Sequence, residues 1–413
     1  MRGGTVAVVG GSIAGCAFAS AAARAGADGV VVLERTRGRL ADRGLGLCVH
    51  DERAAELVRA GALPGGIAAH RLERRRWVVR DDAAGPGGRV IWEQPFPFHS
   101  YHWGLLWRGL REATPDSVVY RQGVAVTGVT GADGGAGDGA GGGDGAGAEV
   151  RLGDGSVERY DLAVGADGYR SVVREAVCPG ARPHYAGYVC WRGNFDAARL
   201  EGPGSHPEAV TTVCFPGGSC VIYRIPGPDG PRVNWVLYAP PPQGGQLRFD
   251  DPTSFPPGAL TPELLDHLRA LLEREFPPHW GRALALTDPA DTFVQPIYDL
   301  ETASTTAGRL LLAGDAATVV RPHNTSGAAK ALQDATAFAA AWGRAGTWEE
   351  LLRDYQAARG AAGRELVALA RRLGRAQVER TPAWARMSRA EAEAWWQGQL
   401  AGAPGIGGQA MTP

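Results

Sequence analysis

The chain has 413 residues, of which 44% are hydrophobic and 21% are charged, and these fractions are ordinary for a globular protein of roughly two or three domains. Its formal net charge of −1 argues against nucleic acid or an anionic membrane as the main partner. The six cysteines lack C-x-x-C spacing, which argues against a metal site or a disulfide scaffold, and no stretch has the length of a transmembrane helix. Because the N-terminus also lacks a signal-peptide pattern, we expect a cytoplasmic protein.

The chain opens with an apolar run that predicts a strand, and the sequence Gly-Gly-Ser-Ile-Ala-Gly at residues 10–15 follows it and enters a helical pattern. Such a turn points unpaired backbone N–H groups and the positive end of a helix dipole at a pyrophosphate. We expect Gly10 to permit the tight turn and Gly15 to let the helix pack closely. Gly11 is expected to allow close approach of the ligand, and the hydroxyl of Ser12 is expected to donate to phosphate.

The apolar segment Gly29–Leu33 predicts a second strand, so that residues 5–34 form a β-α-β unit. Glu34 ends this strand at the separation where a carboxylate accepts both ribose hydroxyls of an adenosine. The alternative is a surface acid at a strand end, but the β-α-β context favours the ribose role.

The middle of the first half combines regular elements with a low-complexity run. Gly131–Ala148 consists mostly of Gly, Ala and Asp, and this composition cannot bury enough apolar surface to order itself, so it predicts a mobile hairpin insertion. The other expected elements are a helix at 51–62, a strand at 72–79, an amphipathic helix at 101–114 that carries Arg108, strands at 124–129 and 149–152, and a strand at 162–164 that enters Gly165-Ala166-Asp167-Gly168.

A β-rich region begins at Tyr185. Its Pro/Gly-bounded strands predict a mostly antiparallel sheet. Cys214 and Cys220 flank a turn in this sheet, and counting back from the turn places the two reduced thiols roughly opposite each other. The expected strands are 185–195, 209–215, 220–225 and 232–238.

The last third returns to helical patterns around a third glycine motif. The apolar run 310–313 predicts a strand that enters Gly314-Asp315-Ala316-Ala317, and a helix from about 327 to 344 follows. The remaining expected elements are a helix at 262–276, a strand at 292–298 and a long helix at 347–375.

Three glycine motifs that each follow a strand, in this order, predict a cradle for one FAD. We therefore expect an α/β fold with a Rossmann-type FAD-binding domain, a second domain built on a mostly antiparallel sheet, and C-terminal helices. The expected division is 1–182 for the first part of the FAD-binding domain, 183–300 for the substrate domain, 301–345 for completion of the FAD-binding domain, and 346–413 for the C-terminal helices and tail.

The chain resembles the FAD-dependent aromatic hydroxylases of the para-hydroxybenzoate hydroxylase-like superfamily, and within it most of all the 2,6-dihydroxypyridine 3-hydroxylases. The resemblance covers nearly the whole chain. It rests on the Gly10-Gly11-Ser12 turn, on Gly-Tyr-Val-Cys-Trp-Arg-Gly at 187–193, on Pro-Arg-Val-Asn-Trp at 231–235, and on the stretch from Gly314 through Arg321-Pro322-His323 to Lys330. The chain departs from the family pattern at Thr318, where many relatives have histidine, and at Thr325-Ser326-Gly327, where they have Gly-x-Gly.

The resemblance implies a role in FAD binding for residues around all three motifs. The expected contacts are Gly10, Gly11, Ser12 and Gly15 at the first turn, Glu34 at ribose, Arg35 beside adenine, Arg108 at pyrophosphate, Asp167 and Gly168 at FAD and the nicotinamide donor, Asp315 at the ribitol and phosphate region, Pro322 against the isoalloxazine ring, Arg43 with Gly44 and Gly46 on its other side, and Gly327 before the last FAD helix.

The same resemblance implies a reaction. NADH or NADPH would reduce FAD transiently, and O2 as co-substrate would form a flavin C4a-hydroperoxide that hydroxylates an electron-rich aromatic or N-heteroaromatic small molecule. The candidates for a base or proton relay are His323, then His50 and Tyr188. The candidates for the substrate lining are Trp191, Arg192, Tyr223, Asn234 and Trp235.

Other functions remain open at this stage. The same fold could carry out epoxidation, Baeyer–Villiger oxidation or oxidation without oxygen insertion, and a non-catalytic flavin-binding redox sensor is the alternative of another class. We expect a monomer or homodimer that binds a small aromatic substrate, with no nucleic-acid or membrane partner and no metal.

Overall fold

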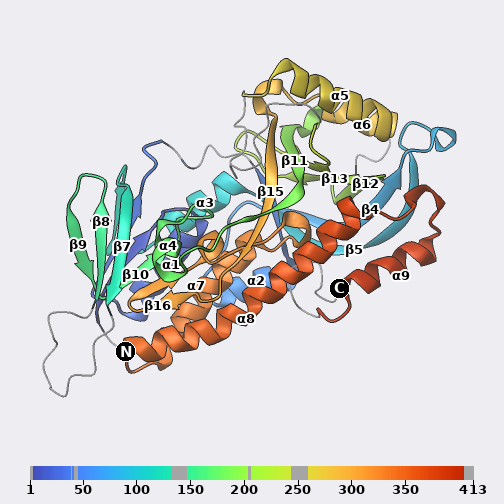
Figure 1. The fold of residues 1–413 in the computed structure, drawn as a ribbon. Helices are drawn as coiled ribbons and strands as arrows, with labels where there is room; N and C mark the ends of the chain where they lie inside the picture. The colour runs from blue at the N-terminus through green and yellow to red at the C-terminus, as the bar shows by residue number, and fades with distance from the viewer. Residues whose placement is uncertain are drawn as a thin grey trace, which may run out of the picture.

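The computed structural model describes residues 3–38, 40, 45–132, 147–202, 206–242 and 259–403. Their strands form a six-stranded, a nine-stranded and a three-stranded sheet (Figure 1). Arg43 and Gly44, residues 133–146 of the Gly-rich run, and the C-terminal tail from 404 lie outside the described residues. Within the described part of the chain, no helix has the length and apolar character needed to cross a membrane.

The six-stranded sheet carries all three glycine motifs at the ends of its strands. Its order is β16-β17-β10-β1-β2-β6, and the pairs from β17 to β6 are parallel. Because the carboxyl ends of parallel strands meet at one edge, the turns after β1, β10 and β17 lie together there. The strands are β1 (Thr5–Val9), β2 (Gly29–Glu34), β6 (Val118–Gln122), β10 (Leu162–Gly165), β16 (Thr306–Ala307) and β17 (Leu310–Leu312).

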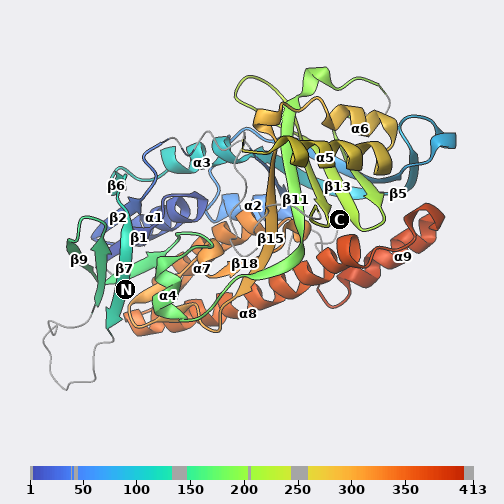
Figure 2. The same cartoon turned by 45° about the horizontal axis from the view of Figure 1, so that its top comes forward.

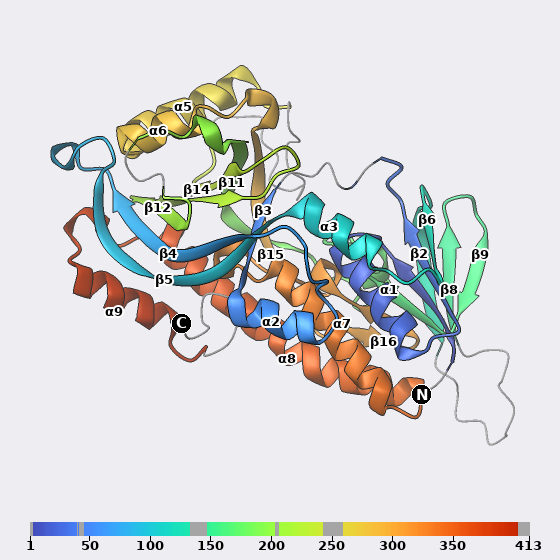
Figure 3. The same ribbon diagram turned by 180° about the vertical axis from the view of Figure 1, so that it is seen from behind.

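Both faces of this sheet are covered, which explains why its central strands are apolar without alternation. One face packs against α1 (Ile13–Ala25) and α7 (Gly327–Arg344), and α8 (Trp348–Gly374) packs on α7 (Figure 3). The other face packs against α4 (Val172–Val177) and the three-stranded sheet of β7 (Val126–Ala132), β8 (Gly147–Leu152) and β9 (Val157–Tyr160). The helices α2 (Asp51–Arg59) and α3 (Trp103–Glu112) complete this half of the molecule.

The nine-stranded sheet confirms the predicted antiparallel character, with one parallel pair between β4 and β12. Its order is β18-β15-β11-β14-β13-β12-β4-β5-β3. The strands are β3 (Gly46–His50), β4 (His70–Val79), β5 (Arg89–His102), β11 (His184–Asp196), β12 (Ala209–Phe215), β13 (Gly218–Ile225), β14 (Arg232–Ala239), β15 (Phe293–Glu301) and β18 (Thr318–Val319).

The predicted boundary at residue 182 does not separate the two large sheets, because β3, β4 and β5 from the first half of the chain belong to the nine-stranded sheet. A local strand pattern indicates an extended segment but not its partner. The strands β3, β5, β6, β9, β16 and β18 are not among the predicted elements.

One face of the nine-stranded sheet is covered by α5 (Pro262–Glu275) and α6 (Pro278–Leu284) (Figure 1). On the opposite face, the outer ends of β4 and β5 pack against the C-terminal part of α8 and against α9 (Arg389–Leu400). Figure 2 shows α8 running from the six-stranded sheet to the nine-stranded sheet, so that a single helix spans both halves of the molecule.

The hairpin of β12 and β13 corrects the expected placement of its two thiols. Cys214 pairs with Ser219, and Cys220 pairs with Val213, because the turn is shorter than predicted. Adjacent positions along a strand point to opposite faces, so the two cysteines lie on different faces of the sheet. Both are free thiols, as expected.

Candidate active site

A cavity of about 680 Å³ extends between the six-stranded and nine-stranded sheets. Its lining joins the glycine motifs, through Ser12, Asp167 and Asp315, to the cavity-facing side of the nine-stranded sheet, through Tyr223 and Tyr238. Most of the predicted cofactor residues that are described line this cavity: Gly10, Ser12, Glu34, Arg35, Gly46, Asp167, Gly168, Asp315, Pro322 and Gly327.

The first glycine turn has the backbone that its sequence predicts. Gly10 has a φ of 99°, and a Cβ at this position would lie 2.4 Å from the carbonyl oxygen of Ala166. A Cβ at Gly15 would lie 1.9 Å from the carbonyl oxygen of Gly10, so the helix approaches the turn more closely than any side chain permits. Ser12 occupies the N-cap position of α1, yet its hydroxyl caps none of the N–H groups of this described helix and lies at the cavity.

The structure gives Gly11 a packing role. Its carbonyl oxygen accepts hydrogen bonds from Tyr120 Oη at 2.9 Å and Trp107 Nε1 at 2.8 Å. A Cβ at Gly11 would lie 2.0 Å from Tyr120 Oη. The glycine therefore permits close packing of the turn against Tyr120, and it lies outside the cavity lining.

Glu34 lies at the end of β2 beside this turn. One carboxylate oxygen accepts from the N–H of Gly11 and the other from the N–H of Thr36, each at 2.7 Å. The side chain is buried and reaches the cavity. Because each carboxylate oxygen can accept more than one hydrogen bond, Glu34 can hold the turn and still accept ribose hydroxyls.

Asp167 has a carboxylate at the cavity, and one of its two oxygens lacks a protein partner among the described residues. Its Oδ2 accepts from the N–H of Val172 at 2.7 Å and of Val173 at 3.3 Å, which caps α4. Its Oδ1 is buried and has no hydrogen-bond partner among the described residues. Burial raises the pKa of this carboxyl. A buried acceptor at the cavity that lacks a protein partner fits a polar ligand that donates to it.

Asp315 lines the cavity from the third motif, and its turn is fixed by a buried ion-pair network. Lys330 is the only lysine of the chain. Its Nζ donates to the carbonyl oxygen of Gly314 at 2.7 Å and pairs with Asp334 at 3.2 Å. The same aspartate accepts from the N–H of Gly314 and pairs with Arg359 at 2.6 Å. Enclosure raises the pKa of the Asp315 carboxyl, and Lys330 opposes this shift.

His323 lies at the junction of the two halves of the cavity, next to Pro322. Its Nε2 lies 2.8 Å from Tyr188 Oη, and its ring centroid lies 4.2 Å from that of Tyr238. Burial, together with the positive charges of Arg321 and Arg75, lowers the pKa of the imidazole to about 3. The structure therefore keeps His323 neutral at physiological pH.

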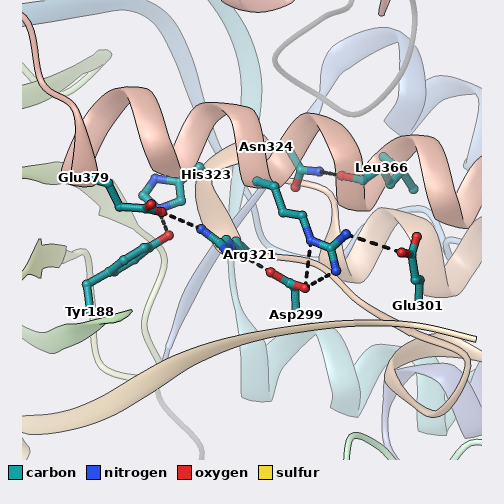
Figure 4. A network of polar contacts seen from close by, with 9 residues as sticks. Tyr188, Asp299, Glu301, Arg321, His323, Asn324, Leu366 and Glu379 are labelled. Carbon is teal, nitrogen blue, oxygen red and sulfur yellow. Dashed lines mark hydrogen bonds and ion pairs between the residues drawn. The ribbon is translucent and has the colours of Figure 1, made fainter. Parts of the chain in front are cut away.

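Behind His323, an ion-pair network ties the loop to α8 (Figure 4). Arg321 pairs with Asp299 at 2.8 Å and with Glu379 at 2.9 Å, and Arg371 pairs with Asp299 at 2.6 Å. The Asp299 side chain is fully buried, and two arginines from different segments balance its charge. This network fixes the position of the Pro322–His323 segment relative to β15 and α8.

Two of the predicted substrate residues line the cavity, namely Arg192 and Tyr223. Trp191 and Trp235 do not, because they pack into the core under α5 and α6. Since neighbouring strand residues point to opposite faces, Trp191 and Arg192 cannot both face one cavity. Asn234 is buried outside the lining and accepts from the N–H of Gly46 at 2.9 Å, so it positions the strand that approaches the cofactor end.

The other predicted residues lie away from the cavity. His50 is buried at the start of α2, where its Nδ1 accepts from the N–H of Glu52 at 3.3 Å. Tyr188 reaches the cavity only through His323. Arg108 is exposed on α3 and lies outside the lining.

The lining residues that were not predicted include three with polar groups, namely Arg75, Tyr238 and Gln377. Arg75 is the middle residue of three consecutive arginines, 74–76, a pattern typical of a solvated strand. Because side chains alternate along a strand, Arg75 points to the opposite face from Arg74 and Arg76. Only the pairing of β4 with β12 shows that the face of Arg75 is buried. Gln377 lies beyond the predicted end of the last long helix and carries no local signal.

Comparison with known proteins agrees with this geometry. Residues 269–370 match a family model described as an FAD binding domain. The solved structure of 2,6-dihydroxypyridine-3-hydroxylase from Arthrobacter nicotinovorans superposes with a TM-score of 0.76 at 26% sequence identity, over 92% of this chain and 94% of that chain. This chain therefore shares its fold with that hydroxylase, and part of it is similar to FAD binding domains.

Two curated relatives align with the chain over shorter regions. The 2,6-dihydroxypyridine 3-monooxygenase of Paenarthrobacter nicotinovorans is 33% identical over 46% of this chain and 50% of its own length. The FAD-dependent urate hydroxylase of Klebsiella pneumoniae is 32% identical over 55% of this chain and 54% of its own length. The aligned regions thus span about half of each of these relatives.

Proposed function

We propose that this protein is a single-component FAD-dependent monooxygenase that uses NADH or NADPH and O2 to hydroxylate an electron-rich aromatic or N-heteroaromatic small molecule. The observation that carries the proposal is the single cavity that joins three dinucleotide-type turns to an aromatic and polar pocket under the nine-stranded sheet. The named reactions of the two curated relatives, on a dihydroxypyridine and on urate, support a ring substrate of this class.

The residues around the glycine motifs would hold the FAD. In this proposal, Ser12 and the N–H groups at the start of α1 bind phosphate, and Glu34 accepts from ribose. The unpartnered Oδ1 of Asp167 and the carboxyl of Asp315 accept from the sugar-alcohol and phosphate region. When bound, FAD supplies the redox chemistry and the activation of oxygen.

The pocket residues would orient the ring and exclude water. Val210, Val221 and Val236 form an apolar wall, while Tyr223 and Tyr238 offer hydroxyl groups. The low pKa of His323 favours a neutral hydrogen-bonding group over a strong base, so we assign it to holding a substrate hydroxyl, with its own Nε2 oriented by Tyr188. Among the described residues, one parallel sheet carries dinucleotide-type turns, which supports a nicotinamide donor that binds transiently.

A cytoplasmic monomer or homodimer, without a nucleic-acid or membrane partner, completes the proposal. The near-zero charge of the sequence supports the absence of a nucleic-acid or anionic-membrane partner. Sedimentation of the FAD-loaded protein would give the oligomeric state.

The reaction can be tested with FAD-loaded protein and a panel of hydroxypyridines, hydroxybenzoates, purines and indoles. NAD(P)H oxidation should be slow alone and faster with the correct compound, and one labelled atom from O2 should appear as a ring hydroxyl in the product mass. Labelled epoxide or ester products would instead assign epoxidation or Baeyer–Villiger oxidation. Complete recovery of the electrons as H2O2 would identify an oxidase, and no NAD(P)H oxidation under air would favour a redox sensor.

A further inference from the structure

A buried amide from the C-terminal part of the chain faces the candidate substrate pocket. Gln377 is 2% exposed and lines the cavity, and its Nε2 has no hydrogen-bond partner among the described residues. It lies on the π-helical turn Arg375–Glu379 that continues α8, and such turns often occur at functional sites. A buried donor without a protein acceptor is costly, so an acceptor on a ligand is its natural partner.

A buried guanidinium lines the same cavity from β4. Arg75 is 2% exposed, and its Nε donates to Thr212 Oγ1 at 2.8 Å. Its central carbon lies 4.1 Å from the ring centroid of Trp77 and 5.4 Å from that of Trp396. Two indole rings therefore contact one guanidinium, and the second ring comes from α9. This contact links the C-terminal helix to the orientation of a cavity residue.

The acidic residues that line the cavity, Glu34, Asp167 and Asp315, lie at or just after the ends of β2, β10 and β17, where Arg35 and Arg170 also line it. From the described part of the nine-stranded sheet, the charged lining residues are Arg75 and Arg192. Burial lowers the pKa of Arg75 to about 10, which leaves the guanidinium protonated at neutral pH. An enclosed site with positive charge favours an anion over a neutral isostere.

We propose that Arg75 and Gln377 form a recognition subsite for an anionic oxygen substituent, a carboxylate or an oxyanion, on the aromatic substrate, and that Trp396 is a positioning residue for Arg75. The guanidinium supplies charge-assisted donors in a planar fork, and the amide donates one further hydrogen bond. As a statement about the substrate, this inference rests on the proposed function, but anion binding itself does not require turnover.

The first experiment therefore measures binding without a reductant. Calorimetric titration of FAD-loaded protein with benzoate, 4-nitrophenolate and the neutral benzamide separates the two anion chemistries from a neutral ring of similar shape. We expect at least one anion to bind about tenfold or more tightly than benzamide. Benzamide binding equal to or tighter than both anions, or no binding of either anion, would overturn the proposal.

Variants then assign the preference to residues. Arg75→Met and Gln377→Leu should each lower anion affinity by about tenfold while benzamide affinity stays unchanged. Arg76→Met is the matched control, because Arg76 neighbours Arg75 on β4 but pairs with Glu93 at 2.7 Å on the other side of the strand. An unchanged anion preference in both Arg75→Met and Gln377→Leu would contradict the subsite. If Arg75→Met does not retain FAD, Arg75→Lys, which keeps charge but loses the planar fork, takes its place.

The role of Trp396 requires a readout that general destabilisation would not give. Trp396→Leu should weaken binding of the preferred anion more than that of benzamide. Trp396→Phe keeps an aromatic face, so it should retain the affinity for the anion. Equal weakening of both ligands would show a merely structural role.

In turnover, Arg75→Met should raise KM more than it lowers kcat. Absence of labelled oxygen in any product, with anion preference intact, would refute the monooxygenase but not the subsite.

Discussion

At the scale of single residues, two kinds of buried polar group characterise the candidate site: groups that lack a hydrogen-bond partner, and a hydrogen-bonded pair of uncharged side chains. Asp167 Oδ1 and Gln377 Nε2 have no partner among the described residues, and both lie at the cavity. His323 and Tyr188 satisfy each other, and burial raises the pKa of the tyrosine while it lowers that of the histidine. Both side chains are thus held in their neutral forms.

The neutral His323 should contribute to the acid sensitivity of the fold. Its pKa is about 3 in the folded protein against an ordinary value of 6.5, so the unfolded chain binds the extra proton between these values. The free energy of unfolding should therefore fall with decreasing pH in this window, by at most about 1.4 kcal/mol per pH unit from this group, and be unaffected above it.

The contribution of His323 to the free energy of unfolding can be measured by urea unfolding of the parent and of His323→Gln, each at about pH 7.5 and about pH 5. The variant should lose less stability on acidification, by up to about 2 kcal/mol, because glutamine does not titrate. Other buried histidines titrate equally in both proteins, so they cancel in the difference. Equal losses in the two proteins would show that His323 is readily protonated in the fold.

At the scale of elements, α8 determines the geometry around His323. A Cβ at Gly374, the last residue of this helix, would lie 2.5 Å from Tyr188 Oη and 3.2 Å from His323 Cδ2. The helix can therefore cross both halves of the molecule only with a glycine where it passes the His–Tyr pair.

Gly374→Ala should lower the free energy of unfolding by about 1–3 kcal/mol, because overpacking outweighs the better helix propensity of alanine. Gly343→Ala is the matched control, since Gly343 lies in α7 with no atom within 4 Å of a new Cβ. It should stabilise by up to about 1 kcal/mol. Denaturant unfolding compares the two, and equal effects of both substitutions would contradict the packing argument.

At the scale of the whole molecule, the Gly-rich insertion enters the structure far from the candidate substrate pocket. Ala132 at the end of β7 pairs with Gly147 at the start of β8, so the insertion joins two neighbouring strand ends. Figure 1 shows this three-stranded sheet at the opposite end of the molecule from the nine-stranded sheet.

Replacement of residues 133–146 by an Asn-Gly turn should leave FAD content and substrate-stimulated NAD(P)H oxidation within about twofold of the parent, because such a turn joins paired strands directly. Flavin absorbance and initial rates provide the measurement. A large loss of activity in a deletion variant that keeps its FAD and its melting temperature would show that the insertion has a functional part.

The sequence by itself determined the fold class, the β-α-β unit and the antiparallel sheet, because these depend on local periodicity and on the backbone demands of glycine turns. Only the tertiary structure decided which face of each strand meets the cavity. It placed Trp191 and Trp235 in the core and Arg192 at the cavity, and it buried Arg75 between two partly exposed arginines. Those outcomes depend on the pairing of β4 with β12 and on the paths of α8 and α9. Such contacts join residues that are distant in the chain, and no local pattern encodes them.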